Sequence, residues 1–264
     1  IMKIIKPVIG GHPGCSFREL LDLWGERGYC EIVSGDSQPS SGFTDVVDSP
    51  EAKCWIGEKG NILLYDFPML DRLKNEYKTC LFGNTYKEGK QNKKWIFWPK
   101  RSRIIDERKI QLRKNDKKMG VTFMGAPTNH DRNRIANSFE PSCDVFMFGE
   151  NPLEHIKYLE ILSSYKFGLC LPGVGPKCLR DIELMSMGVV PIFTPGVAVN
   201  EYYDPPQENI HFIYAKSSNE LIEKKNSISD IQWKNMSEAC IEWFEKNCSV
   251  EGSFKTTMEI INEN

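Results

Sequence analysis

One segment, residues 165–193, constrains the fold of this chain more than any other part of the sequence. Its apolar run at 167–171 is typical of an interior strand of a parallel sheet. A loop with two glycines and two prolines follows, then a predicted helix at 178–187 that Gly188 ends, then a second apolar strand at 189–193. This order indicates an open α/β sheet. Such sheets hold phosphates and nucleotides where the glycine loop meets the helix.

The residues of this segment also resemble the exostosin-like glycosyltransferases. In that family a Lys-Phe pair, an apolar strand and Pro-x-Gly precede an arginine, a glutamate three residues later, and Gly-x-x-Pro-Ile/Val. The matching residues here are Lys166, Phe167, Pro172, Gly173, Arg180, Glu183, Gly188, Pro191 and Ile192. After Glu183 the helix reads Leu-Met-Ser-Met where the family has small residues, and this departure leaves the subfamily open.

The resemblance implies a fold and a function. Exostosin-like enzymes have the α/β GT-B fold, with two Rossmann-like domains facing a central cleft, and transfer a sugar from a nucleotide sugar to a glycan hydroxyl. By this resemblance the donor is a UDP-sugar, Glu183 binds the ribose hydroxyls and Arg180 lies near the diphosphate. The preceding loop adds Gly173, Gly175 and Lys177 to the expected donor site. A guanidinium suits a leaving diphosphate because it stays charged and binds oxygens in a fork.

Each of these features also has a purely structural explanation. Glycines permit turns in any doubly wound domain. An arginine and a glutamate three residues apart on a helix often form a surface ion pair. The ordered set is more specific than any of its members. Two other phosphate-binding loops are excluded, because the chain lacks the Gly-Lys-Ser/Thr of a Walker A motif here and no third glycine falls in register for Gly-x-Gly-x-x-Gly.

The chain is expected to hold two α/β domains. Near the N-terminus an apolar strand, a glycine loop, a helix at 17–27 and a second strand follow one another, as at the start of a Rossmann-like domain. The same order restarts with a strand at 120–125, after a basic segment at 87–118 that holds 13 Lys or Arg against four Asp or Glu. We therefore assign residues 1–113 to an acceptor-binding domain and 114–264 to a donor-binding domain, whose last helix can cross back onto the first.

The loop after the strand at 120–125 offers further donor-site candidates, Gly125 and Arg132, with Asn129 and Arg134 nearby. Its position matches the first loop of GT-B donor domains, where an arginine often meets the diphosphate. The alternative is that Arg132 and Arg134 are solvated helix residues. The sequence leaves both interpretations open.

Glycosyl transfer needs a base for the acceptor hydroxyl and positive charge for the departing diphosphate. The chain has no Asp-x-Asp, the metal-holding motif of GT-A enzymes, so we expect arginine, lysine and helix N-termini to supply this charge without a metal or other cofactor. An inverting enzyme needs only one base. The first candidate is His12, in a glycine loop after the first strand, followed by Asp66 at the end of a strand and then Asp36. A histidine after Gly-Gly can also be a capping or core residue.

The nine cysteines predict reduced thiols rather than a disulfide framework. Their number is odd, no C-x-x-C pair occurs, and several lie in apolar, strand-like contexts. The four histidines share no metal-ligand spacing. Both observations argue against a structural zinc site.

Charge and hydropathy exclude further classes. The net charge of −2 shows that the chain as a whole is not a polyanion binder. No apolar run approaches the roughly 18 residues that a membrane span needs, and the N-terminal segment is too short and too soon polar for a secretory signal. We expect a cytoplasmic protein, or the soluble catalytic part of an enzyme separated from a membrane anchor.

A basic, aromatic stretch at 93–103 favours another class of function. Cations interleaved with tryptophan and phenylalanine can follow a phosphate backbone and stack on bases. Core packing of a strand, or stacking on a sugar ring, explains the same residues. Two alternatives therefore stay open: a nucleic-acid-binding protein and a non-catalytic nucleotide- or sugar-binding module. Salt-dependent retention of an oligonucleotide would support the first, and hydrolysis of a donor would reject the second.

Overall fold

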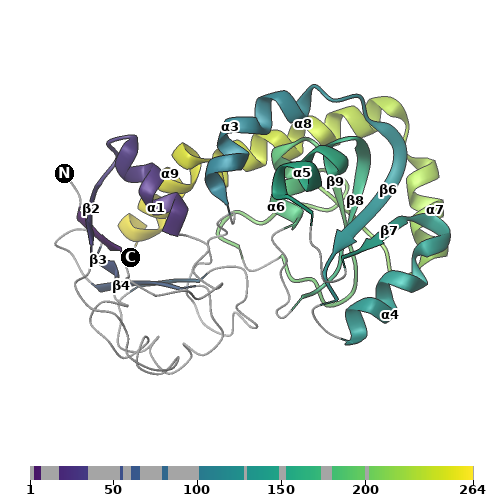
Figure 1. Cartoon of the computed structure of the whole chain (residues 1–264), viewed down its shortest axis with the longest axis horizontal. Coiled ribbons are helices and arrows are strands. Elements are labelled where there is room, and N and C mark those ends of the chain that lie inside the picture. The colour runs from purple at the N-terminus through teal and green to yellow at the C-terminus, as the bar shows by residue number, and fades with distance from the viewer. Residues whose placement is uncertain are drawn as a thin grey trace. The chain divides into compact units, whose positions relative to one another are not determined.

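The chain divides into two compact units. The structure is a computed structural model, and it describes residues 3–6, 18–34, 54–55, 61–65, 79–82, 101–127, 130–148, 153–173, 180–199 and 202–263. The first unit comprises Ile1–Arg103, Glu201–Tyr203 and Asn247–Asn264, and the second comprises Ile104–Asn200 and Asp204–Lys246 (Figure 1). The division falls ten residues before the boundary expected at 113/114. The acceptor and donor roles of the two units stay a prediction.

The first unit begins with a β–α–β arrangement. Strand β1 pairs in parallel with β2, and helix α1 lies between them in the sequence. A second small sheet has β4 in the centre, parallel to β5 and antiparallel to β3. The bounds are β1 Lys3–Lys6, α1 Arg18–Glu26, β2 Glu31–Ser34, β3 Cys54–Trp55, β4 Asn61–Tyr65, β5 Thr79–Phe82 and α9 Val250–Glu263.

Helix α1 packs on the C-terminal helix α9. The apolar stripe of α1 includes Leu20, Leu21 and Trp24, all fully buried. The indole Nε1 of Trp24 donates to Oγ of Ser253 at 3.2 Å, so the buried polar atom of this large side chain has a partner. Phe254 meets the Trp24 ring edge-on at a centroid distance of 5.4 Å. The last helix of the chain therefore belongs to the core of the first unit.

The second unit is built on a five-stranded parallel sheet. Its order is β10-β9-β8-β6-β7, the doubly wound arrangement in which the first strand along the chain, β6, lies inside the sheet (Figure 1). The strands are β6 Lys118–Gly125, β7 Asp144–Met147, β8 Tyr165–Cys170, β9 Val190–Phe193 and β10 Ile213–Tyr214. The mixed α/β class with a parallel sheet is confirmed.

Helices cover this sheet. Their bounds are α3 Ser102–Arg113, α4 His130–Ser138, the 3₁₀ turn η3 Glu140–Ser142, α5 His155–Ser163, α6 Arg180–Ser186, α7 Ser218–Ser227 and α8 Asp230–Asn247. Helices α5 and α6 contact each other and both pack on β8 (Figure 1). Every residue of β8 and β9 is buried, as the continuous apolar runs of the sequence predicted. Gly188 has φ +69° directly after α6, a conformation that favours glycine and ends the helix as expected.

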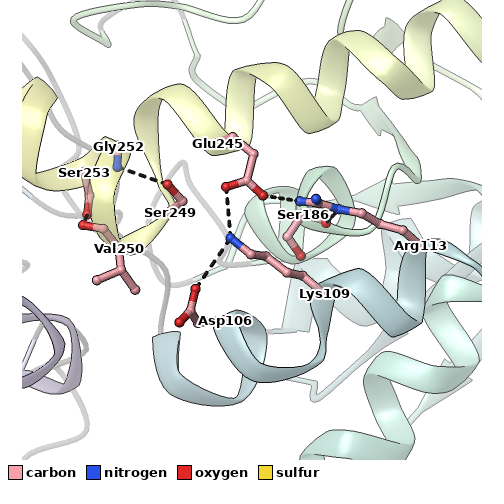
Figure 2. A network of polar contacts seen from close by, with 9 residues as sticks. All are labelled: Asp106, Lys109, Arg113, Ser186, Glu245, Ser249, Val250, Gly252 and Ser253. Atoms are coloured by element: carbon pink, nitrogen blue, oxygen red, sulfur yellow. Dashed lines mark hydrogen bonds and ion pairs between the residues drawn. The ribbon is translucent and has the colours of Figure 1, made fainter. Parts of the chain in front are cut away.

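A polar network joins helix α3 to α8 within the second unit (Figure 2). The Glu245 carboxylate accepts from Lys109 Nζ at 2.9 Å and from Arg113 Nη2 at 2.5 Å, and Lys109 also pairs with Asp106 at 3.5 Å. Burial alone would raise the pKa of Glu245, but the hydrogen bonds and charges of the two cations outweigh it and lower that pKa. The network occupies part of the basic segment, so that segment has a structural role here.

The sequence predicts a helical or irregular linker at 105–115, and the helical alternative is confirmed, because most of these residues belong to α3. Two other elements differ from what the sequence predicts. A helix is predicted over 153–165 but ends at Ser163, because Tyr165 already pairs in β8 opposite Lys118. A strand is predicted at 210–214, and β10 is shorter. Among the helices that the structure describes, none combines the length and apolar character that crossing a bilayer requires.

Candidate functional site

The topology of the second unit marks one place on its sheet. From β6 the chain moves to β7 on one side, then returns to β8 on the other side and continues outward to β9 and β10. The point between β6 and β8 is therefore the topological switch point. Doubly wound sheets bind ligands outside the carboxyl ends of the strands at such a point. Here these ends are Gly125 and Cys170.

Arg180 fills the space beside the end of β6. Its guanidinium carbon lies 4.3 Å from the centroid of the Phe123 ring, and its Nη2 donates to the carbonyl oxygen of Met124. A Cβ atom built on Gly125 would collide with this guanidinium. Position 125 therefore has to be a glycine, because the guanidinium of Arg180 occupies the space that any side chain would need. Arg180 is only 6% exposed, so it lies inside the fold and not on the solvated helix surface expected for a simple ion pair.

Glu183 lies one turn further along α6 and is held by helix α5. The side-chain hydroxyl of Tyr158 donates to its Oε2 at 2.9 Å, and Nε2 of His155 lies 3.4 Å from its Oε1, an ion pair when the imidazole is protonated. Glu183 is 5% exposed. Because residues three apart share one face of a helix, His155 and Tyr158 reach the same carboxylate from α5.

The charges of α6 act on Tyr158. Burial raises the pKa of its hydroxyl well above the ordinary value, and the negative charge of Glu183 raises it further, while Arg180 opposes the shift. Tyr158 therefore stays a protonated donor throughout the physiological pH range. The neutral Tyr158 hydroxyl can therefore donate its hydrogen bond to Glu183 at every pH in this range.

Arg132 joins the same group, and Arg134 does not. Arg132 is 6% exposed, with its guanidinium carbon 5.5 Å from the Phe123 ring centroid. Arg134 is exposed and pairs with Asp131 at 3.3 Å, as a solvated helix residue would. The solvated interpretation thus applies to Arg134, and the donor-site role of Arg132 stays a prediction. Arg132, Arg180 and Gly125 come together around Phe123, while Gly173 follows β8 three residues after Cys170 and is half-buried.

Several sequence-derived candidates lie outside the described residues. These are His12, Asp36, Asp66, Asn129, Gly175 and Lys177, together with residues 93–100 of the basic aromatic stretch. Within the remainder of that stretch, Arg103 forms a two-point ion pair with Glu26 in the first unit, at 2.9 and 2.6 Å. This arginine has a structural partner, which favours the structural interpretation for that position.

Sequence reasoning missed three residues of the site: Phe123, His155 and Tyr158. The apolar spacing of α5 predicts that Ile156, Leu159 and Leu162 face inward, and the buried residues of this helix are Tyr158, Leu159, Leu162 and Ser163. The signal available in the sequence was a pair of polar aromatic residues, His155 and Tyr158, three positions apart on one helix. Their partner Glu183 lies 25 residues after Tyr158, and only the fold shows that contact.

The cysteines that the structure describes are buried. Cys30, Cys143, Cys170, Cys240 and Cys248 form no disulfide bond, in line with the expected reduced thiols. Burial raises the pKa of Cys30 to about 11 and that of Cys143 to about 12. Such thiols stay protonated and unreactive. The described residues contain no group of three or more His, Cys, Asp or Glu side chains placed to hold a metal ion.

The larger of two described cavities lies elsewhere. It has a volume of about 410 Å³ and lies between the segment before β10 and helices α7 and α8, lined in part by Asn209, Gln232 and Asn235. A smaller cavity of about 190 Å³ lies between α3 and α5. The candidate site at the switch point therefore rests on sheet topology and side-chain chemistry and not on cavity size.

Comparisons with known proteins find similarity among solved structures, but not among family models or curated sequences. No protein-family model matches the chain, and no curated protein matches its sequence. Among solved structures, one match is the C-terminal domain of a glycosyl transferase group 1 family protein (LpcC) from Francisella tularensis, with 11% identity and a TM-score of 0.35. The match covers 56% of this chain and 93% of that domain. The exostosin-like resemblance of residues 165–193 stays a prediction from sequence.

Proposed function

We propose that this chain is a glycosyltransferase of the GT-B type, and that its second unit binds a nucleotide-sugar donor at the switch point between β6 and β8. Two independent lines support the proposal. The parallel sheet has the order that places ligands at this point. Arg180 and Glu183, which the resemblance assigns to the donor, lie there together with Gly125, the donor-site candidate from the loop after β6.

The observation that carries the proposal is the buried, held carboxylate of Glu183 at the switch point. The Tyr158 hydroxyl donates to one of its oxygens, and Nε2 of His155 lies 3.4 Å from the other. A carboxylate offers about four acceptor positions, so these contacts are compatible with hydrogen bonds to the vicinal hydroxyls of a ribose. Such charge-assisted hydrogen bonds are stronger than neutral ones and select the nucleotide part of the donor.

The diphosphate of the donor is expected to lie beside the two arginines, Arg180 and Arg132. Arg180 and Arg132 both lie beside the Phe123 ring, near the end of β6. Positive charge placed there stabilises the leaving diphosphate as its charge grows in the transition state. Gly173, Gly175 and Lys177 belong to the same proposal: the glycines provide backbone N–H groups for the diphosphate, and Lys177 provides a further positive charge.

The remaining parts of the reaction are assigned from the sequence. The donor is a UDP-sugar and the acceptor is a glycan hydroxyl, so the enzyme is a hexosyl- or pentosyltransferase. The first unit provides the acceptor site and the base, with His12 as the first candidate and Asp66 and Asp36 as alternatives. Transfer proceeds with inversion and without a metal ion.

A thermal-shift panel tests the nucleotide site. UDP, ADP and GDP and their sugar conjugates are added to the full chain, and a ligand at 100 times its dissociation constant adds about 2.7 kcal/mol to the free energy of unfolding. Glu183→Ala is expected to weaken binding by about 1.5–3 kcal/mol, with or without a sugar on the nucleotide, and so to remove roughly half or more of this stabilisation at the same ligand concentration. Glu160→Ala is the matched control, because Glu160 is an exposed carboxylate on α5.

Two results would contradict the proposal. If no nucleoside diphosphate or nucleotide sugar stabilises the chain, the donor site does not exist. If Glu160→Ala and Glu183→Ala reduce the shift equally, the nucleotide binds elsewhere. Salt-dependent retention of a single-stranded oligonucleotide without any nucleotide-induced shift would instead favour the nucleic-acid-binding alternative.

A further inference from the structure

We propose that Tyr158 and His155 are positioning residues that make the Glu183 site selective for ribonucleotides over 2′-deoxyribonucleotides. The inference rests on the proposed function, since it concerns how the same site recognises the sugar of the nucleotide. It assigns roles to two residues on α5 that no sequence motif indicated. Neither residue needs to contact the ligand.

Two side chains of α5 contact different oxygens of one carboxylate, Tyr158 through a hydrogen bond and His155 as an ion-pair partner when its imidazole is protonated. Tyr158 donates to Oε2 at 2.9 Å, and His155 Nε2 lies 3.4 Å from Oε1. The oxygens therefore cannot exchange places, and rotation about the last side-chain torsion of Glu183 would break both contacts. That torsion is otherwise broad for a glutamate.

Tyr158 and His155 are themselves held by aromatic packing. Tyr158 is 8% exposed, its ring meets Phe148 edge-on at a centroid distance of 6.0 Å, and the imidazole of His155 stacks on it at 5.4 Å. Aromatic packing of this kind locks both side chains in position. The Tyr158 hydroxyl thus acts as a rigid support for the carboxylate.

The backbone of Glu183 is held independently of these contacts. Its carbonyl oxygen accepts from Oγ of Ser186 at 2.6 Å, and the carbonyl oxygen of Ser186 accepts from Nε of Arg113 at 2.8 Å. Loss of the Tyr158 hydroxyl therefore leaves helix α6 in place and releases only the carboxylate. This separation distinguishes a positioning role from a general structural one.

A fixed carboxylate recognises two hydroxyls better than a rotating one. Both oxygens must face the 2′- and 3′-hydroxyls at once, and a mobile side chain loses rotational freedom when it binds. A 2′-deoxyribose offers only its 3′-hydroxyl. A carboxylate that can rotate accepts one hydrogen bond as well as a fixed carboxylate does. Removal of the support should therefore weaken ribonucleotide binding and leave deoxyribonucleotide binding nearly unchanged.

Isothermal titration of the full chain with UDP and 2′-deoxy-UDP, and with the ADP and GDP pairs, tests this inference. The wild type is expected to prefer the ribonucleotide about tenfold or more, the effect of one charge-assisted hydrogen bond. Tyr158→Phe should weaken ribonucleotide binding about tenfold and change deoxyribonucleotide binding less than about twofold, so that the preference falls toward one.

Tyr165→Phe is the matched control. Tyr165 also donates to a carboxylate in the same unit, Oδ2 of Asp144 at 2.7 Å, but it lies at the amino end of β8, away from the switch point. This variant should keep the full preference for ribonucleotides. His155→Gln is a second test variant, expected to lower the preference in the same direction as Tyr158→Phe.

The outcomes separate the two proposals. If the wild type binds none of the nucleotides, the proposed function is wrong and this inference is wrong with it. If the wild type prefers ribonucleotides and Tyr158→Phe keeps that preference, or weakens both ligands equally, the inference alone is overturned. If circular dichroism shows that Tyr158→Phe does not fold, the ratio measured for His155→Gln decides the question by the same criterion.

Discussion

Arg113 on α3 donates from Nε to the carbonyl oxygen of Ser186, the last residue of α6, at 2.8 Å. The last carbonyl groups of a helix have no partners within that helix, so this arginine satisfies one of them. The same guanidinium pairs with Glu245 on α8 (Figure 2). One side chain thus connects the end of the helix that carries Glu183 to two longer helices.

Arg113→Met should destabilise the second unit. It removes the hydrogen bond to Ser186 and one of the two cationic partners of Glu245. We expect the free energy of unfolding to fall by about 1–2 kcal/mol, because Glu245 is partly exposed and solvent screens the ion pair. Urea denaturation followed by circular dichroism measures this loss. Arg108→Met, at an exposed position on the same helix, should change stability by less than about 0.5 kcal/mol.

A second prediction concerns the contact between β8 and α6. A Cβ atom at Gly168 would lie well inside van der Waals distance of the Leu184 side chain, which is fully buried. Gly168→Ala should therefore cost about 1–3 kcal/mol through overpacking. The double variant Gly168→Ala/Leu184→Ala should lose less stability than the sum of the two single variants, because the smaller side chain makes room for the new methyl group. Strict additivity would contradict the close contact.

Much of the second unit could be predicted from the sequence. The buried strand at 167–171, the short helix ended by Gly188 and the next strand are local patterns, set by continuous apolar runs and a left-handed glycine. Element ends were less accurate. Local sequence allows the preceding helix to extend to Tyr165, but this residue pairs with β6, far away in the sequence, and therefore belongs to β8.

The candidate site could be predicted only in part. Arg180 and Glu183 follow from the motif, but their orientation does not. Arg180 turns inward because the ring of Phe123 and the carbonyl of Met124 lie 56 residues or more before it in the sequence and beside it in the fold. The partners of Glu183 come from another helix for the same reason. Side-chain contacts between distant segments depend on the packing of the elements, which periodicity does not specify.

A third prediction follows from Lys117. Its Nζ donates to the carbonyl oxygen of Ser163 at 2.8 Å, and burial lowers its pKa to about 8. An unfolded lysine titrates near pH 10.4. Between these two values the unfolded chain binds more protons than the folded chain does, so the free energy of unfolding contributed by this group should rise as pH increases above about 8.

Chemical denaturation from pH 7 to 9.5 measures this contribution. Lys117→Met should remove most of this pH-dependent increase in the free energy of unfolding. The full increase, reached once the pH has passed both pKa values, is about 2–3 kcal/mol. Lys114→Met serves as the control, since Lys114 is exposed and should leave the profile unchanged. A direct titration of the Lys117 ε-methylene resonance near pH 10.4 would show that burial does not lower this pKa.

The last prediction concerns how the leaving diphosphate is neutralised in the proposed transfer. The sequence contains no Asp-x-Asp, and the arginines at the end of β6 are fully charged at any physiological pH. If Arg132 and Arg180 supply the charge, the initial rate with a UDP-sugar should be the same with EDTA as with added Mg²⁺ or Mn²⁺. Arg180→Lys should lower turnover more than it weakens UDP binding, because leaving-group charge grows in the transition state. Loss of the rate in EDTA with recovery on adding a divalent metal would show that a metal ion, and not these arginines, carries this role.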